Sequence, residues 1–182
     1  RAEYFSALTP VLRSKLLREA GDAALGSQLY PEALGYFAQR LENCGDHERC
    51  RVETKDGIAT VMRLMSEEGL VTTDEAVAHT RRVYDLARAI GFPSGEILAA
   101  CELGALTAAP ESLEWNQRCI ERATGASCVE FRLLSRMRYA LGLAQVDPTQ
   151  IPNSIRSVES LLRDQRRSAN VLDPTELHGA MA

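Results

Sequence analysis

The stretch from Cys44 to Cys50 brings together several side chains that could bind a metal ion. It spells CGDHERC, and thiolate and imidazole groups are the ligands that zinc prefers. Structural zinc sites, however, use compact CxxC spacing and a second pair of Cys or His residues, and neither occurs near this stretch in the sequence. We therefore predict an inter-helix loop with one buried cysteine and no bound metal.

The cysteines as a set indicate the redox compartment. There are five, an odd number without the dense and regular spacing of small disulfide-rich secreted domains: Cys44, Cys50, Cys101, Cys119 and Cys128. We predict reduced thiols and a reducing, cytoplasmic compartment. The chain begins at Arg1 rather than Met, so a targeting signal could be missing from this fragment. No apolar run is long enough for a membrane span, and none is predicted.

Two groups of arginines could bind phosphate or acidic peptides. They are Arg132, Arg136 and Arg138, followed by Arg163, Arg166 and Arg167. RNA-binding proteins usually add an overall positive charge and interleaved exposed aromatic residues, whereas this chain carries a net charge of -4. Glu130, Glu159 and Asp164 could also pair with these arginines as ordinary helix neighbours. An RNA-binding helical-repeat protein is kept as the alternative function, although nucleic acid is not the favoured partner.

The motifs that usually identify an enzyme are missing from the sequence. It contains no phosphate-binding loop, dinucleotide fingerprint, nucleophile elbow or metal-binding helix motif. His79 and His178 have no Cys or Ser context that would make either a catalytic base, and we place them on a solvated helix face and in a tail. We predict a non-catalytic protein with no cofactor and no metal.

Helix signals fill most of the chain. Hydrophobic residues make up 45% of it but aromatic residues only 5%, a composition that suits packed helices. Pro10 and a Thr72–Glu75 capping box mark two of the helix starts, and Ser94 and Ser127 are candidate caps for two more. Eight helices are predicted, over about 9–29, 31–44, 48–68, 72–91, 94–109, 110–125, 128–146 and 152–170. We treat residues 1–170 as one helical repeat domain and residues 171–182 as a C-terminal tail.

Very small residues recur on alternate predicted helices, which suggests an internal repeat. They are Gly21, Ala59, Gly104 and Gly142, at spacings of 38, 45 and 38 residues. Sixteen residues after three of them, on the following helix, stand Phe37, Ile120 and Val158. A small residue lets a neighbouring helix approach closely, and a large side chain such as Phe37 then fills the gap toward the next hairpin. The alternative is an irregular helical bundle in which this spacing is accidental.

One unit of the repeat has a more specific pattern. Between residues 17 and 41 the chain carries, in order, Ala20-Gly21, Ala24, Tyr30, Glu32-Ala33 and Phe37. This order and spacing resemble the tetratricopeptide repeat family, and the resemblance extends more weakly over about residues 10–165. It implies an all-α, right-handed solenoid of about four antiparallel helical hairpins, in which the first helices line a concave face.

The same resemblance implies a function and a set of candidate binding residues. Tetratricopeptide domains commonly bind a peptide or helix of a partner protein in the concave groove, so we expect a non-catalytic scaffold or adaptor that works within a larger protein or multi-subunit complex. The candidate partner-binding residues are Lys15, Arg18, Asp22, Arg63, Leu98, Arg136, Tyr139 and Leu143. The same face is expected to present Leu25, Glu53, Asp56, Thr60 and Val146.

The kind of ligand is limited by two of these positions. One branch of the family holds a C-terminal carboxylate with lysines and asparagines, but Asp22 and Thr60 stand here at the asparagine places. We therefore do not expect a carboxylate clamp, and an apolar groove nearer the C-terminal half fits a partner helix or extended hydrophobic segment better. Alternatively, Leu98, Leu143 and Val146 belong to the core.

Overall fold

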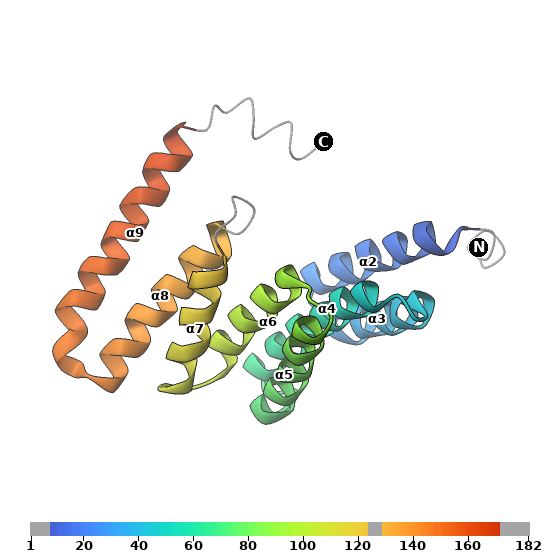
Figure 1. The fold of residues 1–182 in the computed structure, drawn as a ribbon, viewed down its shortest axis with the longest axis horizontal. Coiled ribbons are helices and arrows are strands. Elements are labelled where there is room, and N and C mark those ends of the chain that lie inside the picture. Colours follow the sequence, from blue (N-terminus) through green and yellow to red (C-terminus); the bar gives the residue numbers. More distant parts are fainter. Residues whose placement is uncertain (1–7, 124–128, 172–182) are drawn as a thin grey trace. The chain divides into compact units, whose positions relative to one another are not determined.

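The protein is built from α-helices. The computed structural model describes residues 8–123 and 129–171, which contain eight α-helices and no strand (Figure 1). The helices are α2 (Pro10–Gly26), α3 (Tyr30–Cys44), α4 (Glu48–Glu67), α5 (Thr73–Ala89), α6 (Pro93–Leu106), α7 (Glu111–Arg122), α8 (Val129–Val146) and α9 (Ile151–Val171). A short 3-10 turn, η2 (Pro148–Gln150), leads into α9. The predicted all-α class with eight helices is confirmed.

Local sequence signals set several helix starts. Thr9 caps α2 by accepting a hydrogen bond from the N–H of Leu12, and Pro10 is the first helical residue. Thr72 and Glu75 form the predicted capping box at the start of α5. Ser94 does not cap α6, because the helix already begins at Pro93, whose fixed φ suits a first helical position. The predicted cap at Ser127 lies outside the described residues.

The chain divides into two compact units, residues 1–107 and residues 108–182. In the first unit each helix from α2 to α6 packs on the next, and α4 also contacts α2 and α6. In the second unit α7 packs on α8, and α8 packs on α9. The single repeat domain over residues 1–170 stays a prediction, and the tail expected after it lies almost entirely outside the described residues.

Helix α4 lies at the centre of the first unit. Its residue Val61 joins a core cluster with Ala24, Tyr30, Ala33 and Phe37 from α2 and α3. Further toward its N-terminus, Val52 and Ala59 of the same helix join a second cluster, whose other members are Val83, Ala87, Phe92 and Ala99 from α5, α6 and the turn between them. The two clusters show that α4 is covered by neighbouring helices on both sides.

The side chain of Phe37 occupies the narrow space between two glycines. A Cβ atom added at Gly21 of α2 would lie 2.7 Å from Cε1 of Phe37, and one added at Gly57 of α4 would lie 3.0 Å from the same atom. The Phe37 ring is 1% exposed. The prediction that Phe37 fills the gap left by Gly21 is confirmed. Sequence reasoning missed Gly57, although a glycine inside a long helix is itself a signal of close packing.

The other small residues of the predicted repeat are also buried: Ala59, Gly104 and Gly142. A Cβ atom at Gly142 would lie 2.8 Å from Cδ2 of Leu113 in the preceding helix, α7. The helix that approaches Gly142 closely is thus α7, although α8 packs against both α7 and α9. Among the described helices, none combines the length and apolarity needed to cross a membrane.

Candidate functional site

Helices α2, α3, α4 and α6 of the first unit line an open hollow of about 430 Å³, which we name the α4 hollow. Helix α4 contacts the other three helices. The hollow is lined by Arg18, Asp22, Leu25, Phe37, Arg40, Glu53, Asp56, Gly57, Thr60, Phe92, Ser94 and Leu98. Its lining therefore combines aromatic and aliphatic side chains with charged ones.

The α4 hollow gathers residues that the sequence placed on one face of alternate helices. Among the candidate binding residues, Arg18, Asp22 and Leu98 line it, together with the expected neighbours Leu25, Glu53, Asp56 and Thr60. Lys15 lines an adjoining hollow of about 460 Å³, which shares Arg18, Arg40 and Glu53 with the first. Arg63 lies outside both hollows and bridges Glu102 and Glu67. Whether these residues bind a partner stays a prediction.

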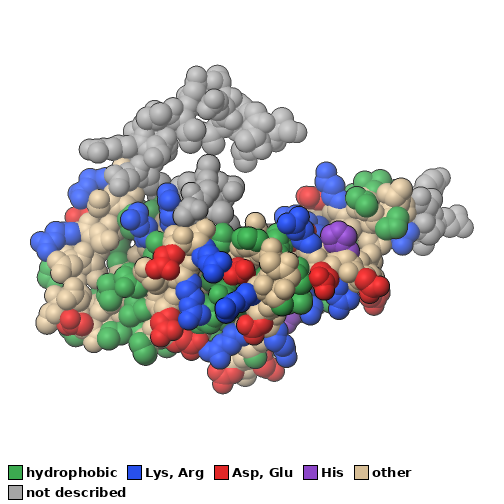
Figure 2. Space-filling model, in the orientation of Figure 1, with side chains coloured by type: hydrophobic (Ala, Val, Ile, Leu, Met, Phe, Trp, Pro, Cys, Tyr) green, Lys and Arg blue, Asp and Glu red, His purple; other side chains and the backbone are tan. Residues whose placement is uncertain are grey.

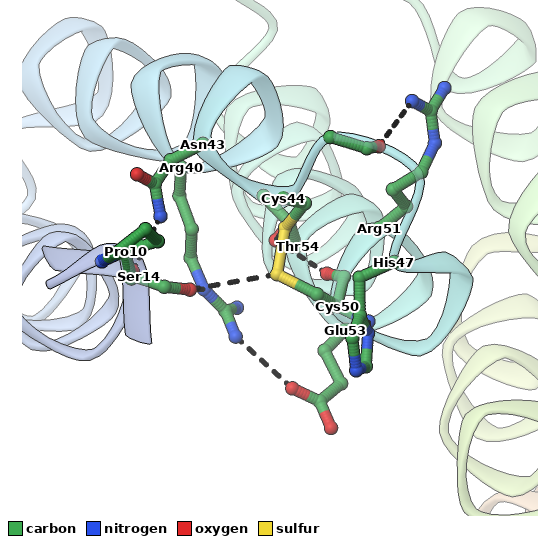
Figure 3. Close-up of a disulfide and its surroundings, with 11 residues drawn as sticks. Pro10, Ser14, Arg40, Asn43, Cys44, His47, Cys50, Arg51, Glu53 and Thr54 are labelled. Atoms are coloured by element: carbon green, nitrogen blue, oxygen red, sulfur yellow. Dashed lines mark hydrogen bonds and ion pairs between the residues drawn. A yellow bond between two sulfur atoms is a disulfide. The ribbon is translucent and has the colours of Figure 1, made fainter. Parts of the chain in front are cut away.

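Most of the charged side chains of the α4 hollow have partners. Arg40, whose side chain is buried, donates to Glu53 with Nη2 and Oε2 3.1 Å apart (Figure 3). Arg18 pairs with Asp22 at 3.6 Å on the exposed rim. These ion pairs balance most of the charge of the lining.

Asp56 is the exception. Its Oδ1 atom is inaccessible to solvent and has no hydrogen-bond partner. Burial raises the pKa of Asp56 to about 7, and the nearby carboxylates of Glu102 and Glu53 add to the rise, while Arg18 partly offsets it. The sequence placed Asp56 on the concave face, but nothing in it indicated that this carboxyl would be buried without a partner.

The second unit carries its own hollow, of about 360 Å³. Three candidate binding residues of α8 line it together: Arg136, Tyr139 and Leu143. Leu143 and Leu98 are half-buried, each in the wall of its hollow. Val146 is 55% exposed, so its alternative assignment to the core is wrong.

A disulfide between Cys44 and Cys50 closes the turn from α3 to α4 (Figure 3). Cys44 is the last residue of α3 and Cys50 lies in the first turn of α4, which puts their Cα atoms 5.6 Å apart. His47 caps α4 by accepting a hydrogen bond from the N–H of Cys50. The expectation of reduced thiols is therefore wrong for this pair, and also for Cys101 and Cys119, which are disulfide-bonded as well. The compartment stays a prediction. Among the described residues, no group of His, Cys, Asp and Glu is arranged to hold a metal ion.

Breaking this disulfide should weaken the first unit. We expect Cys44→Ser to lower the free energy of unfolding by roughly 2 kcal/mol, because the short loop is no longer closed in the unfolded chain. Urea unfolding of Cys44→Ser, of Cys50→Ser and of the double variant measures the effect. The double variant should lose little more than either single variant, since one bond is removed in all three. Full additivity of the two single losses would contradict a bond between these cysteines.

The arginines of the second unit are partly neutralised. Arg163 pairs with Glu159 at 3.9 Å, as expected from their helix spacing, and Arg118 pairs with Glu114 at 3.7 Å. The side chains of Arg166 and Arg167 lie outside the described part of the structure. On the face of the first unit visible in Figure 2, basic and acidic side chains are interspersed. RNA binding, which generally uses a continuous basic surface, stays an untested alternative.

His79 is not on a solvated face. It is half-buried in α5, and its Nε2 lies 3.1 Å from the backbone oxygen of Lys55 in α4. Burial lowers the pKa of His79, which favours the neutral imidazole. The predicted solvated face is wrong for His79, because α5 packs on α4 along this side. His178 lies outside the described residues.

Comparison with known proteins identifies no relative of this chain. No family model, curated protein or solved structure matches this chain. The resemblance to the tetratricopeptide repeat family consequently stays a prediction.

Proposed function

We propose that this chain is a non-catalytic scaffold that holds a peptide or helix of a partner protein in the α4 hollow. The observation that supports the proposal is one open hollow whose lining comes mostly from alternate helices, α2, α4 and α6, together with Phe37 and Arg40 of α3. A right-handed solenoid of about four tetratricopeptide-like hairpins would present its first helices in this way. That architecture, and a role within a larger protein or complex, are parts of the proposal.

The chemistry of the α4 hollow suits a peptide with both apolar and polar side chains. Leu25, Leu98 and Phe92 give it apolar walls, whose burial against a ligand would supply affinity. Arg18 and Asp22 on the exposed rim would mainly affect the orientation of the ligand and its salt dependence. A hollow of about 430 Å³ has room for a few side chains of a bound segment.

Selection from a random peptide library displayed on phage, followed by affinity measurements on the selected peptides, tests this proposal. We expect Leu98→Glu to weaken these peptides at least tenfold, or about 1.4 kcal/mol, because a carboxylate in the apolar wall must lose water when the peptide binds. Ala38→Glu, at an exposed position of α3, is the matched control and should bind like the parent.

Two further experiments distinguish the proposal from binding in the second hollow and from RNA binding. The double substitution Arg136→Glu and Tyr139→Ala changes two side chains that line the hollow in the second unit. This variant should still bind the selected peptides. If this variant loses binding while Leu98→Glu keeps it, with normal thermal melting of both, the second hollow is the binding site. A salt-sensitive shift with a single-stranded RNA probe would instead favour the RNA-binding alternative.

A further inference from the structure

An unsatisfied carboxyl group lies in the wall of the α4 hollow. Oδ1 of Asp56 is out of contact with solvent and accepts no hydrogen bond. Buried polar atoms of folded proteins are nearly always hydrogen-bonded, so an exception calls for an explanation. Asp56 itself lines a hollow that is open to solvent, so a cation bound in the hollow would lie beside this carboxyl group and supply a counter-charge.

The cationic side chains close to Asp56 are already engaged elsewhere. Arg40 donates to Glu53, and Arg18 pairs with Asp22. Arg63 donates through Nε to Oε2 of Glu102 at 2.5 Å. None of these arginines satisfies Oδ1 of Asp56.

The balance of charge in the hollow leaves Asp56 as the excess group. Two arginines of the lining, Arg18 and Arg40, face three carboxylates, Asp22, Glu53 and Asp56. Because each arginine is paired with one of the other two carboxylates, the ionised Asp56 is left without a counter-charge. Glu102 of α6 adds further negative potential at this carboxyl. The hollow is thus complementary to one positive charge.

We propose that the α4 hollow binds one basic side chain, a lysine or an arginine, of the partner peptide against the carboxylate of Asp56. This inference rests on the proposed function and names the ligand chemistry of the same site. The aliphatic stem of the basic residue would contact the apolar walls at Leu25 and Leu98, while its charged end pairs with the carboxylate of Asp56. A peptide whose recognition depends on a carboxylate would be repelled from this position.

Binding of a cation should depend on pH, because Asp56 must be ionised to accept it. The charged groups that face Asp56 are Arg18 and Asp22 of α2, Arg40 of α3, Glu53 of α4 and Glu102 of α6. His79 of α5 contacts the backbone oxygen of Lys55. With a pKa of about 7 in the free protein, Asp56 is mostly protonated at pH 6, so the affinity for a basic peptide should be roughly tenfold higher at pH 8.

Four matched peptide libraries test the inference on the full chain. They share randomised flanks and differ at one central residue, which is fixed as lysine, arginine, norleucine or glutamate. By fluorescence polarisation at pH 8, we expect the lysine and arginine libraries to bind at least tenfold more tightly than the other two. Asp56→Asn should abolish this preference, whereas Asp85→Asn, an exposed carboxylate of α5, should keep it.

The outcomes separate this inference from the proposed function. Equal binding of the norleucine and lysine libraries, lost in Leu98→Glu, would overturn the cation site and leave the peptide-binding scaffold standing. If the parent protein binds none of the libraries more tightly than Leu98→Glu does, both the cation site and the peptide-binding scaffold are overturned. A preference for basic peptides that survives in Asp56→Asn would place the counter-charge elsewhere and also overturn the inference.

Discussion

A chain carrying Gly21→Leu is expected to lose about 3 kcal/mol of its free energy of unfolding, at the upper end of the usual cost of overpacking. Even the first side-chain carbon would lie 2.7 Å from Cε1 of Phe37. The Phe37 ring has little room to move, because Gly57 of α4 also packs closely on it, and a Cβ atom added there would lie 3.0 Å from the same Cε1. The leucine would therefore force α2 away from α3 and α4, and would disrupt the core cluster around Ala24 and Val61.

Gly35→Leu is the matched control for this substitution. Gly35 also lies inside a helix, α3, but it is exposed and a Cβ atom there would meet nothing within 4 Å. Its replacement should leave the protein as stable as before or slightly more so, because leucine is the better helix former. Urea unfolding compares the two variants. If they unfold at the same urea concentration, the proposed contact between Gly21 and Phe37 is wrong.

The second large effect concerns pH. We expect Asp56→Asn to raise the free energy of unfolding at pH 8 by roughly 4 kcal/mol and to change it little at pH 4. The pKa of Asp56 is raised to about 7 in the folded protein, so the folded state keeps a proton that the unfolded chain loses near pH 4. As pH rises from about 4 to about 7, this group therefore makes the parent protein less stable. Asparagine cannot ionise and avoids the cost.

Urea unfolding at several pH values between 4 and 8 measures this difference. Asp85→Asn is again a suitable control, because it removes a carboxyl group from an exposed position. Its stability should follow that of the parent across the range. Parallel pH curves for Asp56→Asn and the parent would show that Asp56 ionises freely in the folded protein.

The two predictions concern two parts of the α4 hollow, the packed Phe37 ring at its floor and the Asp56 carboxyl in its wall. The floor depends on Phe37, held between glycines of two helices. The wall contains Asp56, whose charge costs stability until a cation arrives. A residue that destabilises the free protein but is required for recognition is common at functional sites. Asp56→Asn should accordingly give a more stable protein that no longer distinguishes basic peptides.

The sequence by itself determined the helices and the faces they present. Pro10 and the capping box of Thr72 and Glu75 act within one helical turn, so their effect could be predicted without knowing any neighbouring helix. The same holds for the face shared by Arg18, Asp22 and Leu25, because residues three and four apart in a helix lie on one side. The match between Gly21 and Phe37 was predictable because both belong to one short hairpin.

Only the tertiary structure decided how those faces meet. The approach of Gly57 to Phe37, the turn of Gly142 toward Leu113 and the burial of His79 against α4 each depend on which helices pack together and at what angle. The disulfide between Cys44 and Cys50 depends on the turn that joins two helices. The unpartnered Oδ1 of Asp56 depends on the packing of several helices, because Arg18 of α2 and Arg40 of α3 both pair with other carboxylates. Helix periodicity places a residue on a face, but burial and pairing are properties of the space between faces.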